Sequence, residues 1–298
     1  MPNRFVSLLL GGALLAATAA SAEHTAQPAT VQAHPALWVA KDKDTTIYLF
    51  GTVHILKPQL SWFDGAVKKA FDSSDQLVLE VVMPDDATMH ALVAKLGLNA
   101  DAQTLPDKLP AAERPAYAKA LSGLGIPPAA FDHVDPWLAA TEFSILPLTK
   151  LGYTPANGPE AVLTGAAKAA GKPIVGLETA EQQLGYLDNL PEAAQIAFLD
   201  ATIDDVPKAE QEFDAIVTNW SKGDPQALAK IINDDMNGQP QLRKTLLTDR
   251  NARWASWIVN RMKTPGTVFI AVGAGHLAGQ ASVIDDLRAD HLTVTRLQ

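Results

Sequence analysis

Two copies of Gly-x-x-His stand near opposite ends of the chain, and each follows a run of apolar residues. The first ends at His54, after the apolar residues 47–50, and the second ends at His276, after the apolar residues 268–272. Each pattern predicts a β-strand that ends in a small-residue turn carrying a histidine. In an open α/β sheet the carboxyl ends of parallel strands line the ligand crevice. The two histidines can therefore meet at one site, as a metal ion or an acid–base pair would require.

Two glutamates are predicted at the ends of further strands. Glu80 lies within the apolar run 77–82, where a carboxylate is rarely left unless it is paired or bound to a metal. The alternative is a glutamate at the sheet edge with access to water. Glu178 ends the run 173–178, and it could equally be an acid that opens the following helix.

Arg250 and Asn251 are secondary candidates on a helix predicted over residues 242–262. An arginine there could clamp a substrate carboxylate or hold one of the glutamates with both arms of its guanidinium. The alternative is a surface arginine, because Asp249 and Arg253 lie beside it and allow surface pairing. The histidines elsewhere in the chain lie in less informative contexts, in the N-terminal lead, the helical middle and the turn before the last strand.

The order of the elements predicts an α/β fold with a mostly parallel central sheet, flanking helices and a large helical insertion that forms a cap. A β-hairpin over residues 37–50 is followed by a helix from Ser61 to Ser73 and by the strand with Glu80. The middle, about 85–170 and 180–262, is mainly helical, and its prolines are expected to cut it into short helices. The chain is expected to end with the strand 267–272, a helix over 279–289 and a closing strand over 292–295.

Composition and the N-terminus predict an exported protein. Residues 1–22 read as a signal peptide, with Arg4 before an apolar stretch and a small-x-small cleavage site, so residues 23–298 would form a single mature domain. The alternative is a membrane anchor, for which the apolar stretch is short.

The chain has no cysteine, which excludes thiolate ligands and cysteine nucleophiles. A net charge of -9 disfavours nucleic acid and anionic lipid as partners. These features fit a periplasmic or secreted bacterial protein that acts on a small molecule or a peptide.

Several common catalytic motifs are absent from the sequence. It has no GxGxxG, no GxxxxGK[ST], no HExxH and no GxSxG, which argues against dinucleotide binding, P-loop chemistry, zincin proteases and serine hydrolases of the nucleophile-elbow type.

Taken together, five segments resemble the TraB/GumN family, in the wider group that includes the Tiki proteins and the erythromycin-esterase-like and ChaN-like proteins. The segments are LFGTVHILKP (49–58), LVLEVVMP (77–84), VGLETAEQQL (175–184), DRNARW (249–254) and FIAVGAGHLAGQ (269–280). The resemblance runs from about residue 37 to residue 297, and the GumN-like branch of secreted bacterial proteins is the most similar.

The resemblance implies a metal-dependent hydrolase whose site residues include both Gly-x-x-His motifs and a glutamate, here His54, His276 and Glu80. Glu178, Arg250 and Asn251 match family-like segments, with less defined roles. Tiki relatives are proteases that use manganese- or cobalt-type ions, whereas other relatives cut esters or bind haem. The superfamily alone therefore does not fix the chemistry.

The leading hypothesis is a secreted, peptidase-like metallohydrolase. His54, His276 and Glu80, with or without Glu178, would hold a divalent transition metal such as manganese, cobalt, iron or zinc. The metal would activate a water, a remaining carboxylate would act as general base, and Arg250 would stabilise the oxyanion. Two alternatives stay open: a periplasmic protein that binds haem or another ligand without turnover, and a metal-free esterase-like hydrolase that uses a histidine and a glutamate.

Overall fold

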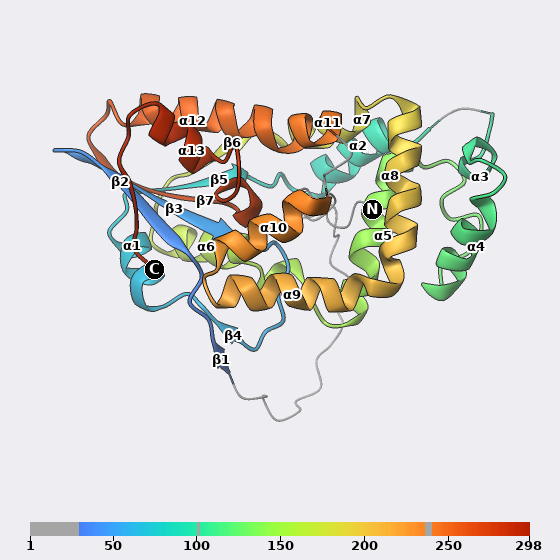
Figure 1. Cartoon of the computed structure of the whole chain (residues 1–298), viewed down its shortest axis with the longest axis horizontal. Helices are drawn as coiled ribbons and strands as arrows, with labels where there is room; N and C mark the ends of the chain where they lie inside the picture. The colour runs from blue at the N-terminus through green and yellow to red at the C-terminus, as the bar shows by residue number, and fades with distance from the viewer. Residues whose placement is uncertain (1–29, 100–101, 236–239) are drawn as a thin grey trace.

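A six-stranded sheet, mostly parallel, forms the centre of the computed structural model, which describes residues 30–99, 102–235 and 240–298 (Figure 1). The strand order is β6-β5-β7-β3-β2-β8, and β6, β5, β7 and β3 run parallel. The strands are β2 (Leu37–Lys41), β3 (Thr45–Thr52), β5 (Gln76–Val81), β6 (Ile174–Glu178), β7 (Gly266–Gly273) and β8 (Val294–Arg296). The predicted fold class and the predicted hairpin of β2 and β3 are therefore confirmed. The predicted signal peptide lies outside the described residues.

The two strands that carry the Gly-x-x-His motifs are direct neighbours at the middle of the sheet. β3 pairs with β7 over its whole length, and the register ends with Thr52 opposite Gly273. Residues on both faces of β7 are buried from Val268 onward, as expected for a central strand covered by helices on both sides. Because the strands are parallel and in step, both motifs leave the sheet at the same edge. β5 pairs with the other side of β7, which brings the strand of Glu80 to that edge.

Helices cover both faces of the sheet. One face packs against helices α1, α6 and α9 around side chains such as Phe50 and Phe269. The other face packs against α12 and α13 around Ile47 and Ile270. The covering helices are α1 (Gly65–Asp72), α6 (Pro159–Ala169), α9 (Ala209–Ser221), α10 (Pro225–Asp235), α12 (Asp249–Arg261) and α13 (Val283–Ala289). Alternate side chains of the central strands point to opposite faces of the sheet and therefore pack into two separate cores.

A third core belongs to helices that lie beside the sheet, on the right in Figure 1. These helices are α2 (Asp86–Gly97), α3 (Leu105–Lys108), α4 (Arg114–Gly123), α5 (Pro136–Lys150), α7 (Ala180–Asp188) and α8 (Glu192–Asp205). They lie within the part of the chain, about 85–170 and 180–262, that the sequence predicts to be mainly helical. One expected break is wrong: Pro147 lies inside α5, which continues to Lys150. A proline removes a single helical hydrogen bond, and the burial of Phe143 and Leu148 in this helix outweighs that loss.

Three predicted helix boundaries are also wrong. Ser61 belongs to β4 (Leu60–Ser61), which pairs with β1 (Val31–Gln32), and α1 begins after Asp64. The last helix starts at Val283, because the Ser282 side chain caps it by accepting from Asp285 N. The helix predicted over 242–262 is divided into α11 (Pro240–Arg243), a π-helical turn over Lys244–Thr248 and α12. Such a π-bulge locally widens a helix and is frequent next to functional sites.

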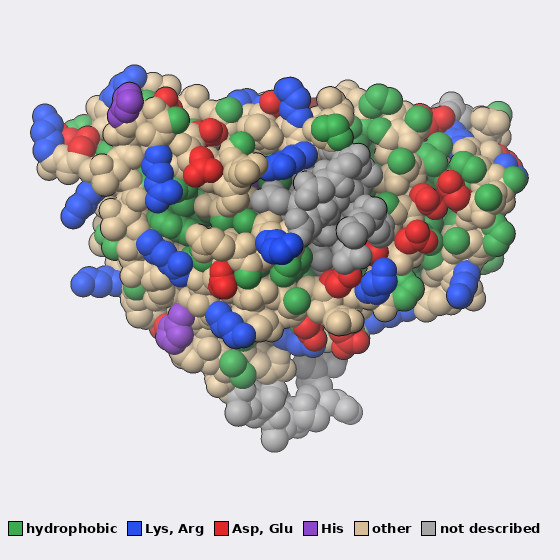
Figure 2. Space-filling model, in the orientation of Figure 1, with side chains coloured by type: hydrophobic (Ala, Val, Ile, Leu, Met, Phe, Trp, Pro, Cys, Tyr) green, Lys and Arg blue, Asp and Glu red, His purple; other side chains and the backbone are tan. Residues whose placement is uncertain are grey.

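The surface carries charges of both signs. On the face shown in Figure 2, Lys and Arg side chains are interspersed with Asp and Glu side chains. In the part of the chain that the structure describes, no helix combines the length and apolar character that crossing a bilayer requires.

Candidate functional site

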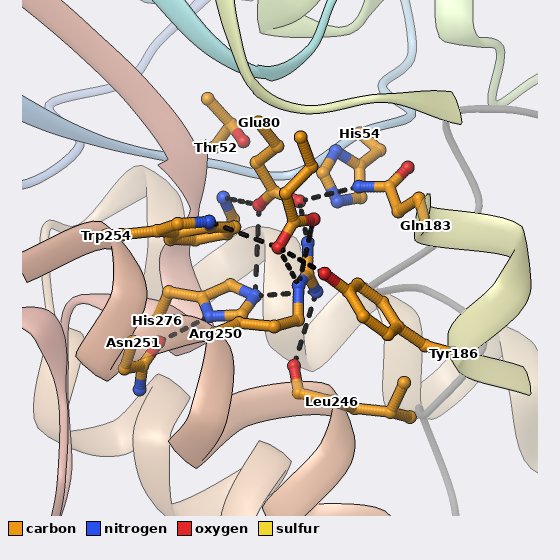
Figure 3. A network of polar contacts seen from close by, with 12 residues as sticks. Thr52, His54, Glu80, Gln183, Tyr186, Leu246, Arg250, Asn251, Trp254 and His276 are labelled. Atoms are coloured by element: carbon orange, nitrogen blue, oxygen red, sulfur yellow. Dashed lines mark hydrogen bonds and ion pairs between the residues drawn. The ribbon is translucent and has the colours of Figure 1, made fainter. Parts of the chain in front are cut away.

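Arg250 is the centre of a buried charge cluster at the carboxyl edge of the sheet (Figure 3). Its side chain is 0% exposed and lies on α12, which packs against the sheet. Its Nη2 atom lies 2.8 Å from Glu80 Oε2 and 2.8 Å from Glu178 Oε2, so one guanidinium bridges the ends of β5 and β6. This placement rules out the surface arginine, and the burial of both glutamates rules out a water-exposed edge position for Glu80. The structure thus brings Glu80, Glu178 and Arg250 together.

Every N–H group of Arg250 has a partner in this cluster. Nε donates to both oxygens of Glu178, and Nη1 donates to the Leu246 carbonyl and to His276 Nε2, the latter at 3.2 Å. The carbonyl of Leu246 belongs to the π-helical turn that precedes α12. A guanidinium with all of its donors used has none left for a substrate oxyanion. Arg250 therefore positions the cluster, and the oxyanion role expected for it has no free donor in this arrangement.

The two glutamates are held by further donors besides Arg250. Glu80 accepts from the backbone N–H of Gly273 at 2.5 Å and from Gln183 Nε2 at 3.1 Å. Glu178 accepts from Tyr186 Oη at 3.0 Å and from Trp254 Nε1 at 3.1 Å. Buried carboxylates need this degree of hydrogen bonding, because an unpaired charge in the interior is costly.

His276 is held as a neutral imidazole with a defined tautomer. Asn251 Nδ2 donates to the Ala281 carbonyl, which fixes the amide so that its Oδ1 faces His276 Nδ1 at 2.6 Å. Nδ1 must then carry the proton, and Nε2 accepts from Arg250. Burial, together with the positive charge of Arg250, holds the pKa of His276 well below its ordinary value. Asn251 thus fixes the tautomer and the ring orientation of His276.

His54 forms a separate pair with Glu160, a residue of the first turn of α6. Nδ1 of His54 donates to Glu160 Oε1 at 2.7 Å, and the same oxygen accepts from Thr52 Oγ1. Burial alone would lower the pKa of His54, but the charge and hydrogen bond of Glu160, helped by Glu80, raise it to about 9. The same pairing lowers the pKa of Glu160 against the effect of its own burial. At 10% exposure, the His54 side chain is more accessible than those of Glu80, Glu178, Arg250 and His276.

The two histidines and Glu80 converge on Gly273, where β7 ends. A Cβ atom added to Gly273 would lie 3.1 Å from Glu80 Oε1, 3.5 Å from His276 Cδ2 and 3.6 Å from His54 Nε2. The missing side chain thus leaves a small space that all three groups border. A cavity of about 40 Å³ adjoins it, lined by His54 and Gly273 and by apolar side chains of α9 and α10. The two Gly-x-x-His histidines thus lie on the same small space, and whether they serve one site stays a prediction.

The arrangement does not fit a divalent metal ion without rearrangement. Within the described residues, no three His, Asp or Glu side chains lie close enough together to hold one ion. Glu80 and Glu178 are bound to Arg250, and the unprotonated nitrogen of His276, Nε2, accepts a hydrogen bond from the same guanidinium. An ion here would have to displace a buried cation from its carboxylates. The predicted metal centre of His54, His276 and Glu80 remains a prediction for elemental analysis to test.

Some members of the site could not be recognised from sequence. Glu160 follows a proline at a helix start, where acids are common for reasons of helix polarity alone. Gln183 and Tyr186 lie on α7, and their segment gives no sign that they turn toward the sheet edge. Trp254 reads as a core residue of α12, yet its indole N–H binds Glu178. A buried carboxylate needs several donors, so the glutamates implied such partners without naming them.

The chain is similar to bacterial proteins and matches one protein family. The chain is 25% identical over 258 residues to the uncharacterized protein YbaP of Escherichia coli (strain K12), which covers 85% of this chain and 92% of the relative. It is 23% identical over 272 residues to an uncharacterized protein of Treponema pallidum (strain Nichols), covering 86% of this chain and 80% of the relative. No solved structure matches the chain. The model of the TraB/PrgY/gumN family matches residues 36–296, and the chain therefore belongs to that family.

Proposed function

We propose that this protein is an exported hydrolase that adds water to the carbonyl group of an ester or peptide bond, with His54 as the general base. The observation that carries the proposal is the hydrogen bond between His54 Nδ1 and Glu160, which leaves Nε2 beside the space at Gly273. A histidine oriented by a carboxylate, with its second nitrogen facing a cavity, is the arrangement that activates water in many hydrolases. Export by the N-terminal segment is part of the same proposal.

In this mechanism the substrate carbonyl lies beside Gly273 and a water lies between it and His54. His54 Nε2 takes a proton from the water as its oxygen attacks the carbonyl carbon. The attack leaves a negative charge on the former carbonyl oxygen, and the imidazolium that forms is stabilised by Glu160 through Nδ1–H. The imidazolium then gives its proton to the leaving group, whose bond to the carbon breaks as the carbonyl double bond re-forms. Thr52 holds Glu160 in place through the oxygen that His54 also uses.

The buried cluster contributes position and charge. Arg250 and its carboxylates fix the ends of β5 and β6, and Glu80 holds the backbone N–H of Gly273. The charge of Glu80 favours the imidazolium form of His54 as it develops, whereas the charge of Arg250 opposes it. His276 stays neutral beside the same space. Environments that push the pKa values of two neighbouring groups apart are typical of acid–base sites.

The test is a hydrolase assay on purified protein with a panel of aryl esters and peptide anilides, with and without a chelator. His54→Asn should lower kcat/KM by at least about a hundredfold, the usual contribution of a positioned base. His90→Ala, at an exposed position on α2, is the matched control and should keep full activity. Full activity in His54→Asn would refute the proposal. Activity that the chelator abolishes and manganese, cobalt or zinc restores would favour the metallohydrolase instead.

A further inference from the structure

The cavity beside His54 has an apolar wall that the proposed mechanism does not use. Its lining includes Phe213 and Ile216 of α9 and Leu228 and Ile232 of α10, and these side chains are at most 8% exposed. Both helices face the carboxyl edge where His54 and Gly273 lie. The cavity is therefore apolar on the helical side and polar on the side of the candidate site.

The cavity is small. One water molecule needs roughly 10–15 Å³ of such volume, so about 40 Å³ holds about three waters or a chain of about three carbon atoms. An apolar lining gives water few hydrogen-bond partners, so an alkyl group is the better occupant. The size excludes an aromatic ring unless the helices move.

We infer that this cavity is the specificity pocket for a short aliphatic group, about three to four carbons long, on the acyl side of the substrate carbonyl. The inference rests on the proposed function for the identity of the reacting group. The orientation follows from the lining: the polar end of the substrate lies by His54 and Gly273, and the alkyl chain points toward Leu228 and Ile216. A short-chain acyl ester or a peptide with a small aliphatic side chain has this shape.

Chain length is therefore the variable to test. We would titrate the protein with acetate, butanoate, hexanoate and octanoate and follow the methyl NMR signals of Ile216, Leu228 and Ile232. Affinity should rise by about fourfold for each methylene that enters the pocket, reach its maximum near butanoate and fall for hexanoate. The kcat/KM values of the matching p-nitrophenyl esters should follow the same order.

Leu228→Ala removes the end of an apolar side chain from the pocket and should reverse the order, so that hexanoate binds more tightly than butanoate. Leu287→Ala on α13 is the matched control, because Leu287 is equally buried but packs in the core on the opposite face of the sheet. It should keep the wild-type order. Ile216→Ala tests the same wall from α9 if Leu228→Ala does not fold.

The outcomes separate the two proposals. Equal binding of all chain lengths, or the same order in Leu228→Ala as in Leu287→Ala, would overturn the pocket. The expected binding order without hydrolysis of any ester would refute the proposed function and leave the pocket standing. Hydrolysis without preference for chain length would overturn the pocket and leave the proposed function standing.

Discussion

Replacing Glu160 by Gln tests how the charge on His54 is set. In the wild type the pKa of His54 is raised from 6.5 to about 9, in spite of its burial, by the charge and hydrogen bond of Glu160. The difference corresponds to about 3 kcal/mol in favour of the protonated form. Glutamine keeps the size and a hydrogen-bond acceptor but removes the charge. Burial then dominates, and the pKa of His54 should fall below the ordinary histidine value.

The same change has consequences for stability and for rate. Because the folded-state pKa lies above the unfolded value, the pair stabilises the fold fully below pH 6.5, and this contribution is lost as the pH rises through about 9. The free energy of unfolding of the wild type should therefore fall by up to about 3 kcal/mol over that range, and Glu160→Gln should flatten the fall. As a general base, His54 must be neutral, so kcat/KM of the wild type should rise about tenfold per pH unit up to about 9.

The assay is an NMR titration of the histidine Cε1–H signals, with His54→Asn to identify the signal of His54, combined with urea unfolding at pH 6 and pH 10. Thr88→Ala, a change at an exposed position on α2, is the control and should leave the titration of His54 unchanged. A wild-type His54 that titrates near 6.5, or a Glu160→Gln protein with an unchanged titration, would refute the reasoning.

Three further changes address the remaining parts of the site. Gly273→Ala should fold, because the φ of -49° at this residue suits alanine. The added methyl group would lie 3.1 Å from Glu80 Oε1, in the proposed reaction space, and should abolish hydrolysis. A Gly273→Ala variant that still hydrolyses its substrate would place the chemistry elsewhere. Arg250→Met takes the guanidinium away from Glu80 and leaves Glu178 only Arg253, whose Nη2 lies 3.7 Å away, so it should lower the free energy of unfolding by about 3–5 kcal/mol in urea. A loss below about 1 kcal/mol would contradict the role of Arg250 in holding both carboxylates. Asn251→Ala removes the acceptor of His276 Nδ1–H and should mix the two tautomers, visible in the ¹⁵N shifts of the ring.

The strands, and the histidines and glutamates at their ends, can be predicted from the sequence, because an apolar run followed by a polar residue is a local pattern. That pattern placed His54, Glu80, Glu178 and His276 at one sheet edge, as the structure has them. Which strands are neighbours was not accessible, since β7 inserts between β3 and β5 from the far end of the chain. Helix starts were missed where a side-chain cap decided them, as at Ser282.

The partners of the charged residues were less accessible still. A sequence shows that a buried arginine or glutamate needs an opposite charge, but not which of several candidates approaches it. Arg250 was a candidate clamp for a substrate or for a glutamate, and the structure selects the glutamates. Glu160 gave no signal at all, because its role depends on α6 packing beside the turn of His54. The close approach of Gly158, where a Cβ would lie 2.1 Å from the His54 carbonyl, is likewise a tertiary fact.

Solvent accessibility divides the site into a buried cluster around Arg250 and a more exposed pair of His54 and Glu160, and the two parts have different roles. Arg250, Glu80, Glu178 and His276 are at most 4% exposed in their side chains, so they have almost no direct contact with bulk water. A group that takes a proton from water must reach water, and His54, at 10% exposure on the cavity wall, meets that condition. Changes to the buried cluster should therefore cost stability and activity together. Changes to the pair of His54 and Glu160 should move the pH profile while the fold persists, because that pair is held at the rim by α6 and the end of β3.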